Sequence, residues 1–166
     1  KKLKYIKKLN TKHEVHLHLM VNNPHLKNFD NDDYITHYAN LGADYIGLHR
    51  RTFKDIDEME IAIIKIISLK KKPGIFMEID EDFDYDLSNL VFKHNIKWIV
   101  FMGVPIGYGG QFFNKSIIPK IRNTINFLKK NNHKVKIEVD GGLTTEVIDQ
   151  LNDVGVDYYA GWSIVK

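Results

Sequence analysis

Val-Lys-Ile-Glu-Val-Asp-Gly-Gly, residues 135–142, is the stretch from which the predicted architecture of this chain follows. Val135, Ile137 and Val139 alternate with polar residues, as a strand with one apolar face requires. Asp140 and the two glycines after it end the strand where the backbone must turn. Catalytic groups of parallel α/β barrels lie at the carboxyl ends of strands, and glycines there let a phosphorylated ligand approach the backbone. Asp140 is therefore a candidate site residue, with an ordinary Asp-Gly turn as the alternative.

Strand and helix signals alternate along the whole chain. Short apolar runs predict six strands, over residues 14–21, 44–49, 73–79, 97–104, 135–139 and 157–165. Apolar residues at helical spacing predict helices over residues 34–41, 55–69, 85–94, 117–130 and 145–152, with Ile61, Ile64 and Leu69 buried in the second. Strands linked through helices, in units of roughly 25 residues, predict a parallel sheet with helical cover. A flavodoxin-like open sheet is the alternative to a barrel.

The bulk composition is that of an ordinary globular domain. The chain has 166 residues, which predicts one domain, and its net charge of +3 does not require a nucleic-acid or membrane partner. It contains no cysteine, so disulfides and thiolate metal sites are excluded, and a cytoplasmic location fits. The sequence has no run of about 18 apolar residues and no signal-peptide pattern, so membrane insertion and secretion are unsupported.

Two features near the start of the chain have competing interpretations. His16 and His18 are two residues apart on a predicted strand, so they share a face and could present imidazole nitrogens to a metal. The alternative is a hydrogen-bonded core histidine, and a structural role is the better interpretation for His16. The basic segment 1–10 has apolar residues at three-residue spacing, which predicts the last turns of an amphipathic helix rather than a nucleic-acid patch.

Several motifs in series resemble the ribulose-phosphate 3-epimerase family across essentially the whole chain. They are His18-Leu19-Met20-Val21 with Pro24, Gly42-Ala43-Asp44, Leu48-His49, Met102 with Gly107-Tyr108-Gly109-Gly110-Gln111 and Phe113, Glu138-Val139-Asp140-Gly141-Gly142, and Gly155, Asp157, Ala160 and Gly161. The resemblance implies a (β/α)8 TIM barrel of the ribulose-phosphate-binding type. It identifies the predicted strands as the third to the eighth. We therefore expect residues 1–166 to form a single barrel domain, incomplete at its N-terminus and at its C-terminus, within a longer polypeptide.

The resemblance also implies the chemistry. Members of the family are isomerases of carbohydrate metabolism, in the pentose phosphate pathway. They epimerise D-ribulose 5-phosphate to D-xylulose 5-phosphate at carbon 3. They use two aspartates as acid/base groups and a divalent metal (Zn, Fe, Mn or Co) held by those aspartates and two histidines. By resemblance Asp140 is a catalytic residue and metal ligand, and His18 is a metal ligand. The other histidine and aspartate belong to a strand that this sequence lacks, so the chain alone is not expected to be competent.

The resemblance assigns a larger set of residues to the substrate. These are His18, Met20, Met102, Gly107, Tyr108, Gly109, Gly110, Asp140, Gly141, Gly142, Gly161 and Trp162. For the two methionines, plain core packing is an equal alternative. His49 matches a strand-end histidine of the family with no role to carry over.

Departures from the family pattern leave the substrate open. Arg50-Arg51-Thr52, Glu78-Ile79-Asp80, Pro105-Ile106 and Trp162 stand where the family tends to have other residues. An epimerase for a ketohexose 6-phosphate and a non-catalytic sugar-phosphate-binding protein are therefore the alternatives. The expected partners are a small sugar phosphate and further copies in a homo-oligomer, with neither nucleic acid nor membrane.

Overall fold

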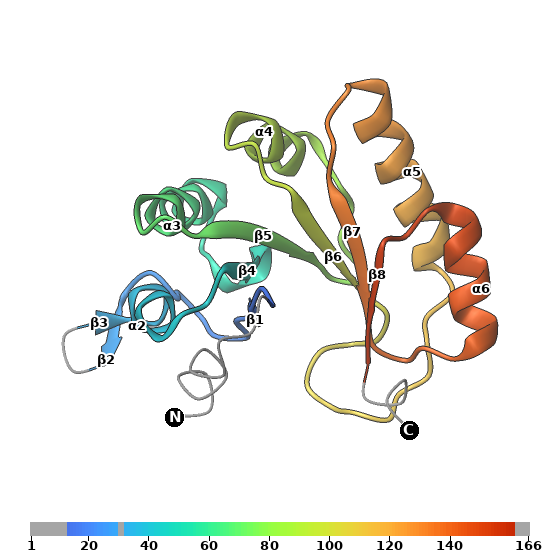
Figure 1. The fold of residues 1–166 in the computed structure, drawn as a ribbon, viewed down its shortest axis with the longest axis horizontal. Coiled ribbons are helices and arrows are strands. Elements are labelled where there is room, and N and C mark those ends of the chain that lie inside the picture. The colour runs from blue at the N-terminus through green and yellow to red at the C-terminus, as the bar shows by residue number, and fades with distance from the viewer. Residues whose placement is uncertain (1–12, 30–31, 162–166) are drawn as a thin grey trace. The chain divides into compact units, whose positions relative to one another are not determined.

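The computed structural model describes residues 13–29 and 32–161 of the chain. Two compact units are present, one ending at Ile75 and one beginning at Phe76, so the boundary falls within strand β5 (Lys72–Met77). In both units parallel strands are connected through helices (Figure 1). No helix among these residues is long and apolar enough to span a bilayer. The single barrel domain expected over residues 1–166 stays a prediction.

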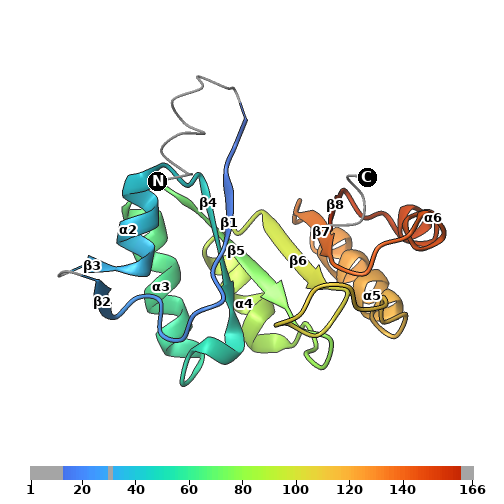
Figure 2. The same cartoon turned by 90° about the horizontal axis from the view of Figure 1, so that it is seen from below.

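Unit 1 contains a parallel strand pair and two adjacent helices. Strands β1 (His16–His18) and β4 (Tyr45–His49) pair in parallel with His18 opposite Gly47, and β5 follows on the other side of β4. Helices α2 (Tyr34–Leu41) and α3 (Ile56–Ser68) lie side by side (Figure 2). A short 3₁₀ turn, η1 (Arg50–Thr52), connects β4 to the segment before α3.

Capping residues account for the ends of these two helices. The Asp33 and Asp55 side chains accept hydrogen bonds from backbone N–H groups in the first turns of α2 and α3, respectively. Helix α2 ends at Gly42, whose φ of 107° is the left-handed conformation typical of a glycine after a helix. The predicted end of this helix is therefore confirmed.

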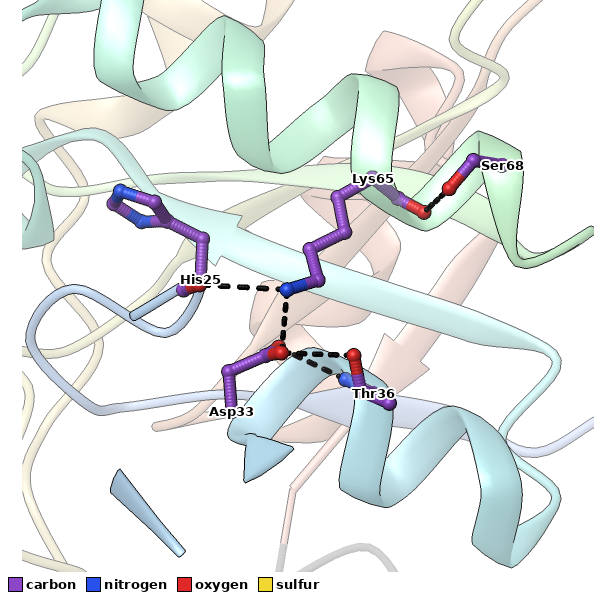
Figure 3. Close-up of polar contacts among 5 residues, drawn as sticks. All are labelled: His25, Asp33, Thr36, Lys65 and Ser68. Carbon is purple, nitrogen blue, oxygen red and sulfur yellow. Dashed lines mark hydrogen bonds and ion pairs between the residues drawn. The ribbon is translucent and has the colours of Figure 1, made fainter. Parts of the chain in front are cut away.

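An antiparallel hairpin precedes α2 and was not predicted. It consists of β2 (Lys27–Phe29) and β3 (Asp32–Asp33), and it interrupts the alternation of strand and helix. Asp33 is almost fully buried, and its carboxylate accepts hydrogen bonds from the backbone N–H and the hydroxyl of Thr36 (Figure 3). Lys65 of α3 forms an ion pair with the same carboxylate. Lys65 also donates to the His25 carbonyl oxygen, at 3.5 Å. This cluster ties the hairpin to both helices, which is a structural role.

Unit 2 contains three adjacent parallel strands and three helices. The strands are β6 (Trp98–Met102), β7 (Lys136–Asp140) and β8 (Tyr158–Ala160), with β7 in the middle. Helix α4 (Tyr85–Lys93) precedes β6, and α5 (Ile117–Lys130) and α6 (Thr145–Val154) pack together beside β7 and β8 (Figure 1). The five residues of β6 are all buried. This burial explains why their sequence is apolar without alternation.

Each predicted strand and helix within the described residues is present, and the observed ends differ from the predicted ones by a few residues. Helix α5 has the predicted bounds, and α6 runs two residues further, to its left-handed cap Gly155. Strands β1 and β8 are shorter than predicted, and the predicted helix 1–10 and the end of the last strand lie outside the described residues.

One prediction about helix burial is wrong. Ile61 and Ile64 of α3 are 56% and 52% exposed, and Leu69 is only half-buried. The buried face consists instead of Met59, Ala62, Ile63 and Ile66. Residues 61–67 are apolar apart from one lysine, so two faces of this helix satisfy the helical spacing. Tertiary packing selects between them.

Candidate functional site

Asp140 is the last residue of the central strand of unit 2. It lies opposite Met102 of β6 and Ala160 of β8, so the ends of two neighbouring strands flank its backbone. The side chain is half-buried, and this burial raises the pKa of the Asp140 carboxyl above its ordinary value. A carboxylate with a raised pKa is a stronger base than a solvated one. The carboxyl end of β7 therefore presents a group suited to removing a proton.

The two glycines after Asp140 form a turn that is packed from both sides. Gly141 and Gly142 have φ angles of 98° and 69°, in the left-handed region. A Cβ on Gly142 would lie 2.6 Å from the Phe113 backbone nitrogen, and one on Gly141 would lie 2.6 Å from a Val104 methyl group. Only glycine fits at either position without displacing neighbours. The turn is thus held rigidly directly after the candidate base.

The glycine-rich loop after β6 is open, in contrast to the tightly packed glycine turn after Asp140. Its predicted residues Gly107, Gly109 and Gly110 have open space where a Cβ would stand, and Tyr108 is 84% exposed. The Gln111 side chain donates hydrogen bonds of 2.7 Å to the carbonyl oxygens of Pro105 and Tyr108, which holds the loop in shape. Exposed backbone without side chains is what a phosphate group needs for hydrogen bonding to N–H groups.

A second carboxylate lies below Asp140 on the same face of β7. Glu138 precedes Asp140 by two residues, and its Oε2 accepts a 2.8 Å hydrogen bond from the Trp98 indole. Burial raises the pKa of Glu138, the bond from Trp98 opposes this, and the nearby Asp140 adds to it. Glu138 is not among the predicted site residues. The period of a strand, which places residues two apart on one face, was the available signal.

In unit 1 the predicted residue His18 ends strand β1 and faces His49. The Nε2 atoms of the two rings lie within hydrogen-bond distance, and the rings stack with centroids 4.7 Å apart. Burial, together with the proximity of His49, lowers the pKa of His18 to about 3. His18 is therefore a neutral imidazole at physiological pH. His49, predicted without a role, is fully buried at the end of the neighbouring parallel strand.

The sequence profile of the ribulose-phosphate 3-epimerase family matches residues 1–165. The chain belongs to this family. Ribulose-phosphate 3-epimerase of Serratia marcescens is 26% identical over 81% of the chain and 61% of that protein. The cytoplasmic isoform of Oryza sativa subsp. japonica is 29% identical over 93% of the chain and 62% of that protein. The chain thus spans about three fifths of the length of these curated relatives.

Several solved structures share this fold at low sequence identity. KGPDC from Streptococcus mutans, solved as a ligand complex, has a TM-score of 0.63 at 15% identity, covering 96% of this chain and 66% of that one. The 3-hexulose-6-phosphate synthase of Salmonella typhimurium has a TM-score of 0.62 at 16% identity, covering 96% and 68%. The predicted fold class, an α/β TIM barrel of this type, is confirmed.

The described residues supply only part of the metal site that the family implies. The neutral imidazole of His18 and the carboxylate of Asp140 are chemically suitable ligands for a divalent cation. However, residues 13–29 and 32–161 contain no group of three or more His, Cys, Asp or Glu side chains that could hold one. The donor set is therefore incomplete among these described residues.

The remaining predicted residues of the family site differ in exposure. Met102 is buried at the end of β6, as plain core packing also requires, whereas Met20 is 52% exposed in the segment after β1. Gly161 directly follows β8, and Trp162 lies outside the described residues. His16 is exposed and contacts the Tyr45 ring, with centroids 4.2 Å apart, so it is not the core histidine considered as an alternative.

Proposed function

We propose that the polypeptide containing this chain epimerises a ketose phosphate at carbon 3, converting D-ribulose 5-phosphate to D-xylulose 5-phosphate. Family membership supports sugar-phosphate chemistry. The observation that carries the proposal is the half-buried Asp140 at a strand end, with its raised pKa and its rigid glycine turn. We assign this activity to the cytoplasm, the location named for the Oryza sativa relative.

In the proposed reaction Asp140 exchanges one proton with carbon 3. Removal of this proton sends the C–H electron pair toward the neighbouring carbonyl, which gives an enediolate. A second acid/base group then returns a proton to the opposite face of carbon 3, and the roles reverse in the other direction. The raised pKa of Asp140 suits both halves of this cycle, because the group must accept and release a proton near neutral pH. By resemblance, the second group is an aspartate of another strand of the barrel.

The other predicted residues are proposed to bind rather than to react. His18 and Asp140 are each proposed as one ligand of a divalent metal, which when bound would stabilise the negative charge on the substrate oxygens. The open backbone at Gly107, Gly109 and Gly110 is proposed to receive the phosphate, together with Gly141, Gly142 and Gly161. Tyr108, Met20, Met102 and Trp162 stay predictions for contacts to the sugar.

Solvent exchange at carbon 3 tests the proposal. The full-length polypeptide is incubated with Mn²⁺ or Zn²⁺ and D-ribulose 5-phosphate in D₂O, and NMR follows deuterium at carbon 3 and the appearance of xylulose 5-phosphate. We expect exchange that falls by about 100-fold or more in Asp140→Asn, because a positioned acid/base group is removed. Asp149→Asn, an exposed aspartate of helix α6, is the matched control and should exchange at the wild-type rate.

The outcomes separate the two alternatives. Exchange with a ketohexose 6-phosphate but not with the pentose would retain the chemistry and change the substrate. Absence of exchange with either sugar, while binding of either remains measurable by calorimetry, would overturn the proposal in favour of a non-catalytic binding protein.

A further inference from the structure

Unit 2 contains a cavity of about 690 Å³ at the end of the strands opposite to Asp140. Its lining comes from the starts of three parallel strands and from the end of α5: Lys97, Ile125, Leu128, Lys129, Asn132, His133, Lys134, Val135, Lys136, Ile137, Gly155 and Asp157. Strand β7 begins at Lys136 and ends at Asp140, about 13 Å away at the usual rise per residue. In Figure 1, β7 runs downward, so that its first residues lie above its carboxyl end. The cavity is thus separate from the proposed catalytic end.

The inner wall of this cavity is apolar. Ile125, Leu128 and Ile137 are at most 5% exposed, so they form a firm surface that belongs to the core of unit 2. Gly155, which has no side chain, leaves space at the mouth, and the Lys129 Nζ would lie 4.0 Å from a Cβ placed there. A volume within the range of about 300–1,000 Å³ is typical of small-molecule sites rather than of polypeptide grooves.

The rim of the cavity carries more positive charge than its own carboxylate balances. Asp157 is the lining carboxylate, and it is already used: Oδ1 pairs with Lys136 Nζ at 2.6 Å and Oδ2 accepts from the Ile137 N–H at 2.9 Å. Lys97, Lys129 and Lys134 have no ion pair with any of the described residues. Three uncompensated ammonium groups around an apolar hollow favour an anion over a neutral or cationic ligand.

The ring of His133, in the lining of the cavity, is held in one orientation. His133 Nε2 lies 3.0 Å from the Ile96 carbonyl oxygen, which can only accept, so this nitrogen donates the hydrogen bond. In the neutral ring Nδ1 is then an acceptor, and the ring itself is held edge-on against Phe92 with centroids 5.1 Å apart. A ligand in the cavity therefore meets a histidine ring held by two contacts, and the ammonium groups of long lysine side chains.

We propose that this cavity binds a small organic anion that has an apolar body and a carboxylate, phosphate or sulfonate head. The body packs against Ile125, Leu128 and Ile137, and the head is held by Lys97, Lys129 and Lys134. The site is independent of the proposed epimerisation, because none of its residues belongs to the predicted catalytic set.

A titration of the full-length polypeptide with 8-anilinonaphthalene-1-sulfonate, an aromatic sulfonate of this chemistry, tests the proposal by fluorescence. We expect one site per chain, with affinity that falls with added salt. Lys129→Glu and Lys134→Glu should each weaken binding by about tenfold, since each exchanges an attraction for a repulsion. Lys130→Glu is the matched control, because Lys130 is the next residue of the same helix end and does not line the cavity. It should change the affinity by less than about twofold.

Further probes complete the test. N-phenyl-1-naphthylamine, which lacks the sulfonate, and inorganic phosphate, which lacks the apolar body, should both bind more weakly. NMR shifts on addition of the sulfonate should centre on Ile137 and Gly155, and circular dichroism must show that the variants are folded. Equal affinity of Lys129→Glu, Lys130→Glu and wild type would overturn the proposal. So would shifts centred on Asp140, or no binding at all because another segment of the polypeptide fills the cavity.

Discussion

His18 in unit 1 and Asp140 in unit 2 occupy equivalent positions, at the ends of parallel strands, but one is a base when neutral and the other is an acid when neutral. Each ends a parallel strand, and burial acts on each in the direction of its uncharged form, lowering the pKa of the imidazole and raising the pKa of the carboxyl. For His18 the result is a nitrogen lone pair that is free of a proton at neutral pH. For Asp140 it is a carboxylate with increased basicity. One physical cause thus prepares both a candidate ligand and a candidate base.

The two residues differ in what supports them. His18 contacts a side chain, because its ring stacks on His49 of the adjacent strand. Asp140 is supported by backbone, because the glycines that follow it pack against Val104 and Phe113. A side-chain support can be altered without a change in chain path, whereas a packed glycine turn cannot. Unit 2 should therefore be more sensitive to the smallest substitutions near its strand end.

The largest effect is expected for Gly142→Ala. The new methyl group would lie 2.6 Å from Phe113 N and 2.8 Å from Phe113 Cα, at a residue with a φ of 69°. We expect a loss of about 3 kcal/mol in the free energy of unfolding, measured by urea denaturation of the full-length polypeptide. Gly109→Ala, with nothing within 4 Å of its Cβ, is the control and should stay within about 0.5 kcal/mol. Equal effects of the two substitutions would show that the turn after Asp140 is not tightly packed.

The second largest effect is expected for the loss of stability at acidic pH that is due to His18. The unfolded imidazole gains its proton near pH 6.5, whereas the folded one does so only near pH 3, so the unfolded state binds more protons between these values. The contribution of His18 to stability is therefore present above pH 6.5 and is lost as the pH falls. Wild type in EDTA should lose about 1–2 kcal/mol more than His18→Gln between pH 7 and pH 5. His13→Gln, at an exposed histidine, should behave as wild type, and a His18→Gln variant with an unchanged pH profile would contradict the shift.

The smallest effect is expected for the stability of Asp140→Asn. A raised pKa means that the folded state prefers the protonated carboxyl of Asp140. The free energy of unfolding therefore decreases as the pH rises above the ordinary pKa of an aspartate, because the carboxyl then ionises. The amide removes this charge, and the free energy of unfolding at pH 7 should increase by less than about 1 kcal/mol, because the group is partly solvated. Denaturation of Asp140→Asn beside Asp149→Asn measures this difference. A decrease would show that the charge is stabilised by its surroundings.

Local sequence was sufficient for much of the architecture. The bounds of α5, the end of α2 at Gly42 and the turn after Asp140 follow from helical spacing and from the conformational freedom of glycine. These features depend on residues close together in the chain, so a single sequence contains their cause. The motif series also identified the family, and the alternation of apolar residues placed Asp140 at the end of a strand. Its role in catalysis stays a prediction.

Contacts between distant residues were decided by the tertiary structure alone. The choice between the two apolar faces of α3, the stacking of His18 on His49 and the bond from Trp98 to Glu138 all join residues that are separated in sequence or ambiguous in pattern. The cavity beside Lys97, Lys129 and Lys134 exists only because three strand starts and one helix end meet. Residue types along the chain predict which elements form. Which side chains are desolvated, and which charges are left without partners, depends on the packing of those elements in space.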